Sequence, residues 1–382
     1  MVPHVVILGG GVGGLTLSDA LARKVGHKAT ITVIDRKSKF AFPPSFLWLM
    51  LGARKPEQIQ RNLSRLNKKG VTVVQDEVSR ILPNEHRVET KTNSFQYDYL
   101  VLALGADYDY QSIRGFENAY HVYDLESAAR LRDELPKFNG GKVAIGVSRT
   151  PFKCPAAPYE AALLIDHYLR NRKIRDKTSI TFFTPEPQPL PAAGPEIGGQ
   201  VSTLLKDRGI VWNPKEKLVE IRNGVCDFES GKTMEFDLLF CVPPHRAPQA
   251  VSAAGLTDQT GWIPIDSSTM ETKQQDVYAV GDVTSIATPH GYVPFLPKAG
   301  VFADGQAETL AKNLAMRIEG KRPSEKWNGK GACFLEIGYG KAAFVSGNFL
   351  AAPRPQLNLK MPSRKWRFGK TLVEKYWLWK HF

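Results

Sequence analysis

The chain has 382 residues, of which 42% are hydrophobic and 10% are aromatic, enough for a large buried core and for more than one domain. Its four scattered cysteines are too few for a disulfide-stapled secreted scaffold. We find no secretory signal, and no apolar run approaches the roughly 20 residues that a membrane-spanning helix needs. The net charge of +13 is concentrated near the carboxyl end. We therefore expect a globular protein made in the cytoplasm and not an integral membrane protein.

A dinucleotide-binding fingerprint opens the chain. It consists of an apolar strand, three glycines in GxGxxG spacing that begin a helix, and an acid at the end of the next strand. The strand covers residues 4–8, the glycines are Gly9, Gly11 and Gly14, and the acid is Asp35. The glycines allow a tight turn and close approach of a pyrophosphate, and the carboxylate suits ribose hydroxyls. Because all four parts agree, the pattern predicts a bound dinucleotide.

Two later segments resemble motifs of two-domain flavoproteins. Residues 98–105 look like the strand-and-glycine motif that closes the first half of such proteins. Residues 276–282 are similar to the late motif whose aspartate, here Asp282, holds ribityl or phosphate oxygens of the flavin. A helix predicted over residues 301–314 would point its positive end at the flavin ring. The resemblance implies that the cofactor is FAD.

The same resemblance implies which side chains and backbone positions hold the FAD. Lys298 and Gly300 stand just before the predicted helix, and Lys298 would favour negative charge on the reduced flavin. The residues assigned to the cofactor are Gly9, Gly11, Gly14, Asp35, Arg36, Val78, Ala103, Gly105, Asp282, Lys298 and Gly300.

The second dinucleotide loop that such flavoproteins carry is spoiled in this chain. A strand over residues 142–146 ends on Gly146, but two prolines and the bulky Phe152, Lys153 and Cys154 occupy the turn that follows. A pyrophosphate would need bare backbone at this turn. We therefore expect a second Rossmann-like domain without a working NAD loop, which argues against a nicotinamide-dependent enzyme.

Cys154 is the candidate nucleophile of the second domain. It lies beside Lys153 and just ahead of a helix predicted to begin near Pro158. A helix N-terminus and an adjacent cation both lower the pKa of a thiol, so we predict a reactive cysteine, with a small buried hydrophobe as the alternative. Glu160, in the first helical turn, is a candidate proton carrier or serves only the helix dipole.

Three segments resemble the sulfide:quinone oxidoreductase family, and the resemblance extends along essentially the whole chain. They are the Cys154 loop, a predicted hairpin over residues 331–341 that carries Cys333, and residues 40–48. The resemblance implies a disulfide or sulfur-bridged pair of Cys154 and Cys333 at the flavin, although the sequence alone does not bring the two together. It further implies that hydrosulfide attacks this pair, that Cys333 passes the electrons to FAD, and that a quinone near Phe334 receives them.

Three other functions stay open. The first is a flavocytochrome c-type sulfide dehydrogenase subunit, opposed by the missing signal peptide and the basic tail. The second is a type II NADH:quinone dehydrogenase, opposed by the spoiled second loop, and the third is a flavin-bearing redox sensor that signals through a partner. We expect Cys241, at the end of an apolar strand, to be structural and Cys226, in a polar stretch, to be incidental, without settling whether either takes part in redox chemistry.

The last residues of the chain predict a basic amphipathic helix. Residues 360–382 carry seven lysines and arginines against one acid, and Phe368, Leu372, Tyr376 and Trp379 form an apolar stripe with helical spacing. Such a helix lies in a membrane interface, where a quinone resides, although docking on the protein's own core is the alternative. We expect a peripheral protein of the cell membrane and a homo-oligomer, and no nucleic-acid partner because no binding module is present.

These patterns predict an α/β fold with two Rossmann-like dinucleotide-binding domains, followed by a C-terminal hairpin and an amphipathic helical tail. The FAD-binding domain is expected at residues 1–110 and 246–325, and the second domain at residues 111–245. Residues 326–382 are expected to form the hairpin and the membrane-binding tail.

Overall fold

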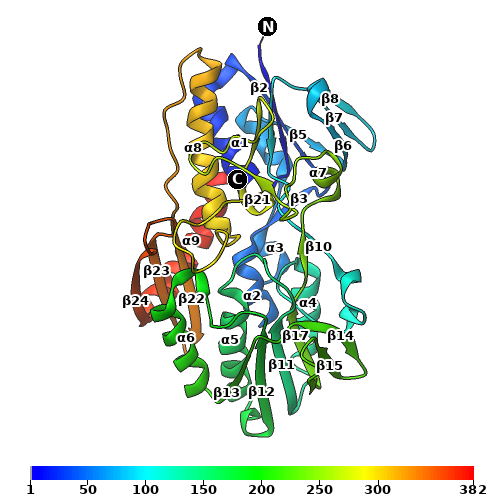
Figure 1. Cartoon of the computed structure of the whole chain (residues 1–382), viewed down its shortest axis with the longest axis vertical. Helices are drawn as coiled ribbons and strands as arrows, with labels where there is room; N and C mark the ends of the chain where they lie inside the picture. The colour runs from blue at the N-terminus through cyan, green and yellow to red at the C-terminus, as the bar shows by residue number, and fades with distance from the viewer. Residues whose placement is uncertain (1) are drawn as a thin grey trace.

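The computed structural model describes residues 2–382 and has two parallel sheets, one above the other in Figure 1, with a smaller antiparallel sheet at their side. The first parallel sheet has the strand order β20-β9-β1-β2-β5. Its strands are β1 (His4–Leu8), β2 (Thr30–Asp35), β5 (Thr72–Gln75), β9 (Tyr99–Leu102) and β20 (Val277–Ala279). Apolar runs such as residues 5–8 are fully buried, as expected for a parallel sheet covered on both faces.

Different elements cover the two faces of this first sheet. Helices α1 (Val12–Val25) and α8 (Gly300–Ile318) pack against each other on one face, where they share a core with β1 and β2. The other face carries a three-stranded antiparallel sheet and a short helix. These elements are β6 (Val78–Leu82), β7 (Arg87–Thr90), β8 (Ser94–Gln96) and α7 (Gln249–Ala253).

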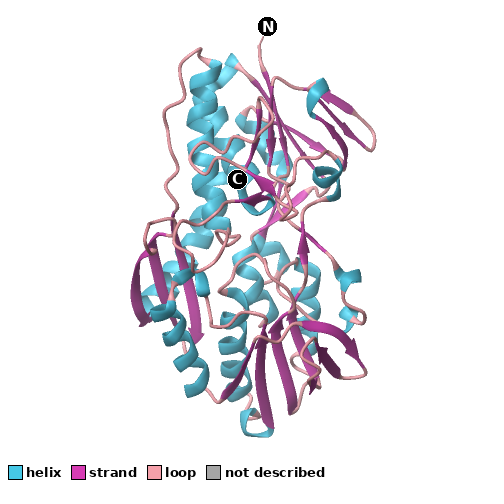
Figure 2. Ribbon diagram, in the orientation of Figure 1, coloured by secondary structure: helices cyan, strands magenta, loops and turns pink. Residues whose placement is uncertain are grey.

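The second parallel sheet, at the bottom of Figure 1, repeats this arrangement in the order β13-β12-β11-β17. Helices cover one face and a three-stranded antiparallel sheet covers the other, as the colours of Figure 2 show. The strands are β11 (Gly141–Val147), β12 (Thr178–Thr184), β13 (Ile210–Pro214) and β17 (Leu238–Val242), and the helices are α4 (Leu125–Glu134), α5 (Ala157–Asn171) and α6 (Pro195–Asp207). The antiparallel strands are β14 (Leu218–Arg222), β15 (Val225–Phe228) and β16 (Thr233–Glu235). The predicted α/β class with two Rossmann-like sheets is confirmed.

Two short strands connect the upper and lower parts of the molecule. Strand β10 (Asp107–Tyr108) pairs antiparallel with β18 (His245–Arg246), so both chain crossings lie side by side. They lie close to the predicted domain boundaries at residues 110 and 246, which stay a prediction. The remaining short elements are β3 (Lys39–Ala41), β4 (Gln60–Asn62), β19 (Ile263–Pro264), β21 (Thr284–Ser285), α2 (Phe46–Met50) and α3 (Pro56–Ile59).

The carboxyl-terminal part forms a separate small sheet and a helix. The predicted hairpin is present as β22 (Lys330–Gly338) and β23 (Lys341–Asn348), but a third strand, β24 (Gln356–Ser363), extends it. Helix α9 (Arg364–His381) follows at once and packs on β22 and β23. Within residues 2–382, no helix combines the length and the apolar composition that crossing a bilayer requires.

Candidate active site

The three predicted glycines of the first loop differ in what surrounds them. Gly9 has φ +104° and its backbone lies so close to Ala103 that a Cβ would overlap the Ala103 carbonyl oxygen. A Cβ on Gly14 would overlap the carbonyl oxygen of Gly9, because α1 starts tightly against β1. By contrast, nothing lies within 4 Å of a Cβ on Gly11. The loop is therefore packed against neighbouring backbone at Gly9 and Gly14 and is open at Gly11, where α1 begins.

Polar groups around this opening suit a dinucleotide. Helix α1 has no side-chain cap and no acid in its first turn, so its N-terminal N–H groups are available to an anion. Asp35 at the end of β2 accepts hydrogen bonds from Gly10 N at 2.6 Å and Lys37 N at 2.7 Å, and its oxygens keep further acceptor capacity for ribose hydroxyls. Asp282 carries a buried oxygen, Oδ1, without a hydrogen-bond partner among residues 2–382. These residues fit FAD.

The other residues assigned to FAD lie around the same loop. Ala103 and Gly105 follow β9, and Gly105 has φ +69°, a conformation that favours glycine. Gly300 is the first residue of α8. Arg36 extends from the end of β2 and forms an ion pair with Asp107 at 3.0 Å. Val78 begins β6 and is partly buried against the core on the other face of the sheet.

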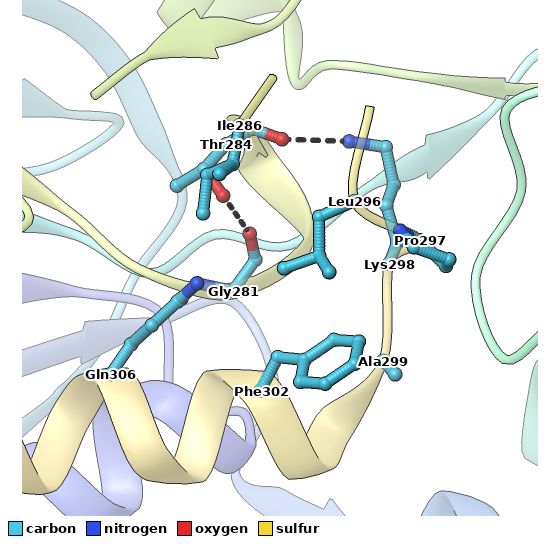
Figure 3. Close-up of a pocket in the computed structure, with 9 residues that line it drawn as sticks. All are labelled: Gly281, Thr284, Ile286, Leu296, Pro297, Lys298, Ala299, Phe302 and Gln306. Carbon is cyan, nitrogen blue, oxygen red and sulfur yellow. Dashed lines mark hydrogen bonds between the residues drawn. The ribbon is translucent and has the colours of Figure 1, made fainter. Parts of the chain in front are cut away.

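Lys298 is buried, and its ammonium group is bonded to backbone carbonyl groups. Its Nζ donates to the carbonyl oxygens of Asp282 at 2.7 Å and Thr284 at 3.0 Å, and it lies over the Trp262 ring. Burial lowers the pKa of Lys298 to about 7, so the side chain is only partly charged at neutral pH. Figure 3 shows it reaching from the start of α8 across a small pocket lined by Gly281, Leu296, Phe302 and Gln306. Lys298 thus braces the 281–285 turn beside the candidate FAD site.

The second loop has no opening comparable to the one at Gly11. The Phe183 ring lies where a Cβ on Gly146 would be, at the end of β11. Ser148 Oγ donates to Val242 O at 2.6 Å, and Arg149 bonds to the carbonyl oxygen of Leu218. Glu186, just beyond β12 where a dinucleotide domain would offer its ribose-binding acid, is buried and accepts a 3.0 Å bond from Tyr159 Oη. The packing therefore agrees with the absence of a working NAD loop.

Cys154 lies in the turn between β11 and α5, as its position in the sequence indicates. It has φ +53°, its N–H donates to Lys298 O at 2.7 Å, and its carbonyl accepts from Ala157 N at 2.9 Å. The turn is therefore joined to the segment that leads into α8. The predicted low pKa is wrong: burial raises the pKa of the Cys154 thiol, and the neighbouring Cys333 and Glu160 raise it further.

Cys333 shares this environment from the other end of the chain. It lies on β22 opposite Val345 of β23, and β22 packs against α5. Burial raises the pKa of Cys333 to about 11, with a further contribution from the Glu160 charge. Both sulfurs are partly buried free thiols in this structure. The structure thus places the two cysteines in one electrostatic neighbourhood, which sequence reasoning alone could not do.

A buried cluster of charged residues lies beside the two thiols. Glu160 on α5 binds the ammonium of Lys370 on α9, and Lys370 also lies 3.4 Å from Glu336 Oε2 on β22. Burial raises the pKa of Glu160 to about 7. Burial lowers the pKa of Lys370, but the Glu160 and Glu336 charges outweigh it and leave the pKa raised. A buried ammonium held between two carboxylates can bind and transfer protons next to the cysteines.

Sequence reasoning found Glu160 but missed its partners. Trp48 on α2 is buried, donates from Nε1 to Glu336 at 2.7 Å and has the Arg367 guanidinium 4.4 Å from its ring centroid. Arg367 Nε in turn donates to Glu336 Oε1. The only sequence signal was a lysine and an arginine three positions apart in a helix otherwise assigned to the membrane. Since the cluster draws on α2, α5, β22 and α9, no local pattern predicts it.

Phe334 lies next to the cysteine site and to the tail helix. Its ring is 4.9 Å from that of Phe344, and Phe344 stacks on Trp366 at 4.7 Å. Gly369 of α9 leaves room beside it, since a Cβ there would approach the Phe334 ring at 3.6 Å. Phe334, Phe344 and Trp366 therefore form an aromatic row from the neighbour of Cys333 to the start of α9.

Helix α9 has its apolar stripe outward and its charged face inward. Phe368, Leu372, Tyr376 and Trp379 are 63%, 51%, 60% and 77% exposed. The buried side holds Lys370, Glu374, Leu378 and His381. Glu374 accepts from Arg54 and Ser45, and His381 contacts Asp19, so ion pairs anchor the helix. Docking on the protein and an exposed apolar stripe thus occur together, although they were alternatives in the sequence.

The other two cysteines belong to a different core cluster from Cys154. Cys226 on β15 and Cys241 on β17 are fully buried in the core between the second parallel sheet and its antiparallel cover. The polar sequence around Cys226 hid this burial, because β15 has only one buried face.

Comparisons with known proteins agree with this geometry. A mitochondrial sulfide:quinone oxidoreductase of Mus musculus is 26% identical over 374 residues, which cover 92% of this chain and 79% of that protein. A sulfide-quinone reductase of Aquifex aeolicus is 29% identical, covering 100% and 91%. The crystal structure of the Aquifex aeolicus sulfide:quinone oxidoreductase superposes with a TM-score of 0.89 at 26% identity, covering 99% of this chain and 91% of that one. The resemblance drawn from the sequence is therefore confirmed.

A family sequence profile that matches most of the chain shows the family to which it belongs. The sequence profile of the pyridine nucleotide-disulphide oxidoreductases matches residues 3–300, from β1 to the start of α8. This span contains the first glycine loop, the Cys154 turn and Asp282. The chain belongs to the pyridine nucleotide-disulphide oxidoreductase family.

Proposed function

We propose that this protein is an FAD-dependent sulfide:quinone oxidoreductase, which oxidises sulfide to polysulfide or elemental sulfur and passes the electrons to a membrane quinone. The main observation is that Cys154 and Cys333, from two distant segments, share one buried site. The Cys154 turn is also bonded to Lys298 O, beside the residues that suit a flavin. The similarity to sulfide:quinone oxidoreductases over most of the chain supports the proposal.

When bound, FAD would supply the two-electron redox chemistry that links the sulfur site to the quinone in this proposal. The first loop would hold its pyrophosphate at the N-terminus of α1, and Asp35 its ribose. Asp282 Oδ1 would bond to the ribityl or phosphate oxygens, which explains a buried carboxylate oxygen without a partner. Gly300 at the start of α8 would bring the positive end of the helix toward the flavin.

The oxidised cysteine pair is the electrophile in this proposal. Hydrosulfide forms a bond to the sulfur of Cys154 while the bond between Cys154 and Cys333 breaks, leaving a persulfide on Cys154 and a thiolate on Cys333. The high pKa of both buried thiols opposes a free thiolate, so the positive charge of Lys370 has a function here. It lowers the pKa of each cysteine and stabilises the thiolate formed on Cys333.

Protons for the quinone would come from the same charged cluster. Glu160 has its pKa raised by burial to about 7, near the pH at which a general acid is most useful. Lys370 bonds to it directly and belongs to the helix that carries the exposed apolar stripe. A quinone at Phe334 would therefore lie between the proton carriers and the lipid.

We further propose that α9 attaches the protein to the membrane surface. The exposed Phe368, Leu372, Tyr376 and Trp379 are large and contiguous, which is unusual for a surface that faces water only. Lysines and arginines around them suit anionic lipid headgroups. The protein would thus be peripheral on the cell membrane, and we expect a homo-oligomer of such chains.

One experiment separates this function from the NADH-dependent alternative. Purified oxidised protein is mixed anaerobically with sulfide, and separately with NADH, while the flavin absorbance is followed. We expect bleaching by sulfide, and no bleaching by NADH because the second loop is closed by Phe183 and Arg149. A subsequent addition of a short-chain quinone should restore the oxidised spectrum. Bleaching by NADH and not by sulfide would overturn the proposal.

A further inference from the structure

A cluster of aromatic and basic side chains next to Cys154 has no place in the mechanism so far. It is built from the loop before α4, from the crossing strands β10 and β18, and from the Cys154 turn (Figure 1). Its members are Tyr108, Tyr110, His121, Tyr123, Lys153 and His245. Lys153, a member of this cluster, directly precedes Cys154 in the chain. Glu160, a member of the charged cluster described above, follows Cys154 on α5.

Two polar atoms in this cluster are buried without a hydrogen-bond partner among residues 2–382: the Tyr123 hydroxyl and His245 Nε2. The two rings meet edge-on with centroids 5.4 Å apart. Burial raises the pKa of Tyr123, and the next largest contribution comes from the charge of Cys154, so the hydroxyl is close to the thiol. Orphaned polar groups of this kind cost stability unless a ligand or water meets them.

The hydrogen bonds define the protonation of His245. Its Nδ1 lies 2.7 Å from the carbonyl oxygen of Pro243, so Nδ1 must carry a hydrogen and donate it. The unpartnered Nε2 therefore presents a lone pair. Burial lowers the pKa of His245, and the neighbouring Lys153 and Lys298 lower it further. The ring is a neutral base aimed into a site with a phenol donor.

Lys153 adds a buried cation to the same place. Its Nζ lies 4.9 Å from the centroid of the Tyr108 ring, and that ring is edge-on to His245 at 5.1 Å. Burial lowers the pKa of Lys153, which the negative charges of Asp282 and Asp124 only partly offset. A small anion beside Cys154 would supply the missing counter-charge.

The polar side-chain atoms of the neighbouring His121 and Tyr110 already have hydrogen-bond partners. His121 Nδ1 accepts from Tyr123 N at 3.3 Å, and its Nε2 meets the Tyr110 hydroxyl at 3.2 Å. Tyr110 also donates to Asp124 at 3.2 Å. These two residues position the Tyr123 backbone and do not offer free groups.

We propose that Tyr123, His245 and Lys153 form the sulfide subsite of Cys154, with His245 as the base that deprotonates hydrogen sulfide. This rests on the proposed function, which supplies the disulfide of Cys154 and Cys333 as the oxidant. Where the substrate arrives as hydrogen sulfide and not as hydrosulfide, its sulfur bonds to Cys154 while one of its protons passes to His245 Nε2 and the electron pair of the broken disulfide leaves on Cys333. Tyr123 donates a hydrogen bond to the attacking sulfur, and Lys153 stabilises its negative charge.

The test uses the oxidised holoprotein under anaerobic conditions with sulfide as the probe. His245→Asn keeps an N–H near the position of Nδ1 but has no base at Nε2. We expect this variant to form the Cys154 persulfide, measured by mass spectrometry after rapid quenching, about 10²-fold more slowly at about pH 5.5, where the substrate is mostly hydrogen sulfide. At alkaline pH the substrate arrives already deprotonated, so the rates of variant and wild type should converge.

A second, more conservative variant keeps the test decisive if His245→Asn folds poorly. Tyr123→Phe preserves the ring and should raise the sulfide concentration for half-maximal persulfide formation about tenfold. Tyr97→Phe also removes a buried hydroxyl that has no partner among residues 2–382, but Tyr97 lies in the core of the first half, so this variant is the matched control and should leave the concentration unchanged. Wild-type rates in both His245→Asn and Tyr123→Phe across the pH range would overturn the subsite. A wild-type protein that forms no persulfide at all would instead refute the proposed function.

Discussion

The upper and lower halves of the molecule have the same architecture, but they differ in the loop that follows the first strand of each parallel sheet. Each half has a parallel sheet with helices on one face and a three-stranded antiparallel sheet on the other. In the first half the loop after β1 opens at Gly11. In the second half the loop after β11 is packed by Phe183 and turns toward the first half, bringing Cys154 to Lys298. The corresponding loop is thus open in the first half, whereas in the second half it is closed and leads into the Cys154 turn.

The acids at the two corresponding positions differ in the same way. Asp35 lies at the end of β2 and bonds to the open glycine loop through Gly10 N. Glu186 follows β12 and is turned into the core against Tyr159, where burial raises its pKa to about 7. The second half therefore has a buried acid at this position, while the first half has an acid beside the open glycine loop.

The largest expected effect follows from the two glycine loops. Gly14→Ala should abolish FAD binding, because the added Cβ overlaps the Gly9 carbonyl and forces α1 away from the loop. Gly146→Ala should lower the melting temperature by displacing Phe183 but leave FAD bound. The flavin absorbance of the purified proteins gives the FAD content, and Gly199→Ala, where a Cβ meets nothing within 4 Å, serves as the control. Loss of FAD from Gly146→Ala alone would contradict the division of roles.

A smaller effect is expected at α9, which we propose attaches the protein to the membrane surface. Replacing Phe368 and Trp379 with serine removes two exposed apolar side chains worth about 3 kcal/mol together, so binding to anionic vesicles should weaken about 10²-fold in a sedimentation assay. Val211→Ser with Val219→Ser, exposed positions on the second half, should have no effect. Removing all residues after Pro362 is a poorer test, because it would also leave Glu160 and Glu336 without Lys370. Unchanged sedimentation of the double serine variant would remove the attachment.

The smallest effect concerns the buried acid of the second half. A carboxyl whose pKa is raised by folding binds protons more tightly when folded, so its contribution to stability falls as pH rises from about 4.5 to about 7. Glu186→Gln should therefore leave stability near pH 4 unchanged and raise it above pH 7, by at most about 3 kcal/mol. Urea unfolding at several pH values measures this difference. An equal change at every pH would mean that ionisation of Glu186 is not the cause.

Much of the upper half could be predicted from the sequence because its signals are local. The glycines, the strands β1 and β2 and the start of α8 each follow from short patterns. The site around Cys154 could be predicted only in part. Its place before α5 was right, but the direction of its pKa shift was wrong, because burial and the nearby Cys333, from the far end of the chain, raise the pKa.

The tail illustrates the same limit. The apolar stripe of α9 has a helical period and was visible in the sequence, whereas the buried partners of Lys370 lie on α5 and β22. For β24, by contrast, the alternation of polar and apolar side chains in residues 356–361 was a usable strand signal, whereas the contacts of Lys370 had none of this kind. Long-range pairing, and not local propensity, decides these contacts.

We infer that the loop after β11 holds a redox-active cysteine, Cys154, that works together with Cys333. Cys154→Ser and Cys333→Ser are each mixed anaerobically with sulfide while the flavin absorbance is followed, with the core variant Cys226→Ala as the control. The account predicts that both serine variants keep FAD and lose sulfide-driven bleaching, whereas Cys226→Ala bleaches like the wild type. Full bleaching in both serine variants would contradict the account.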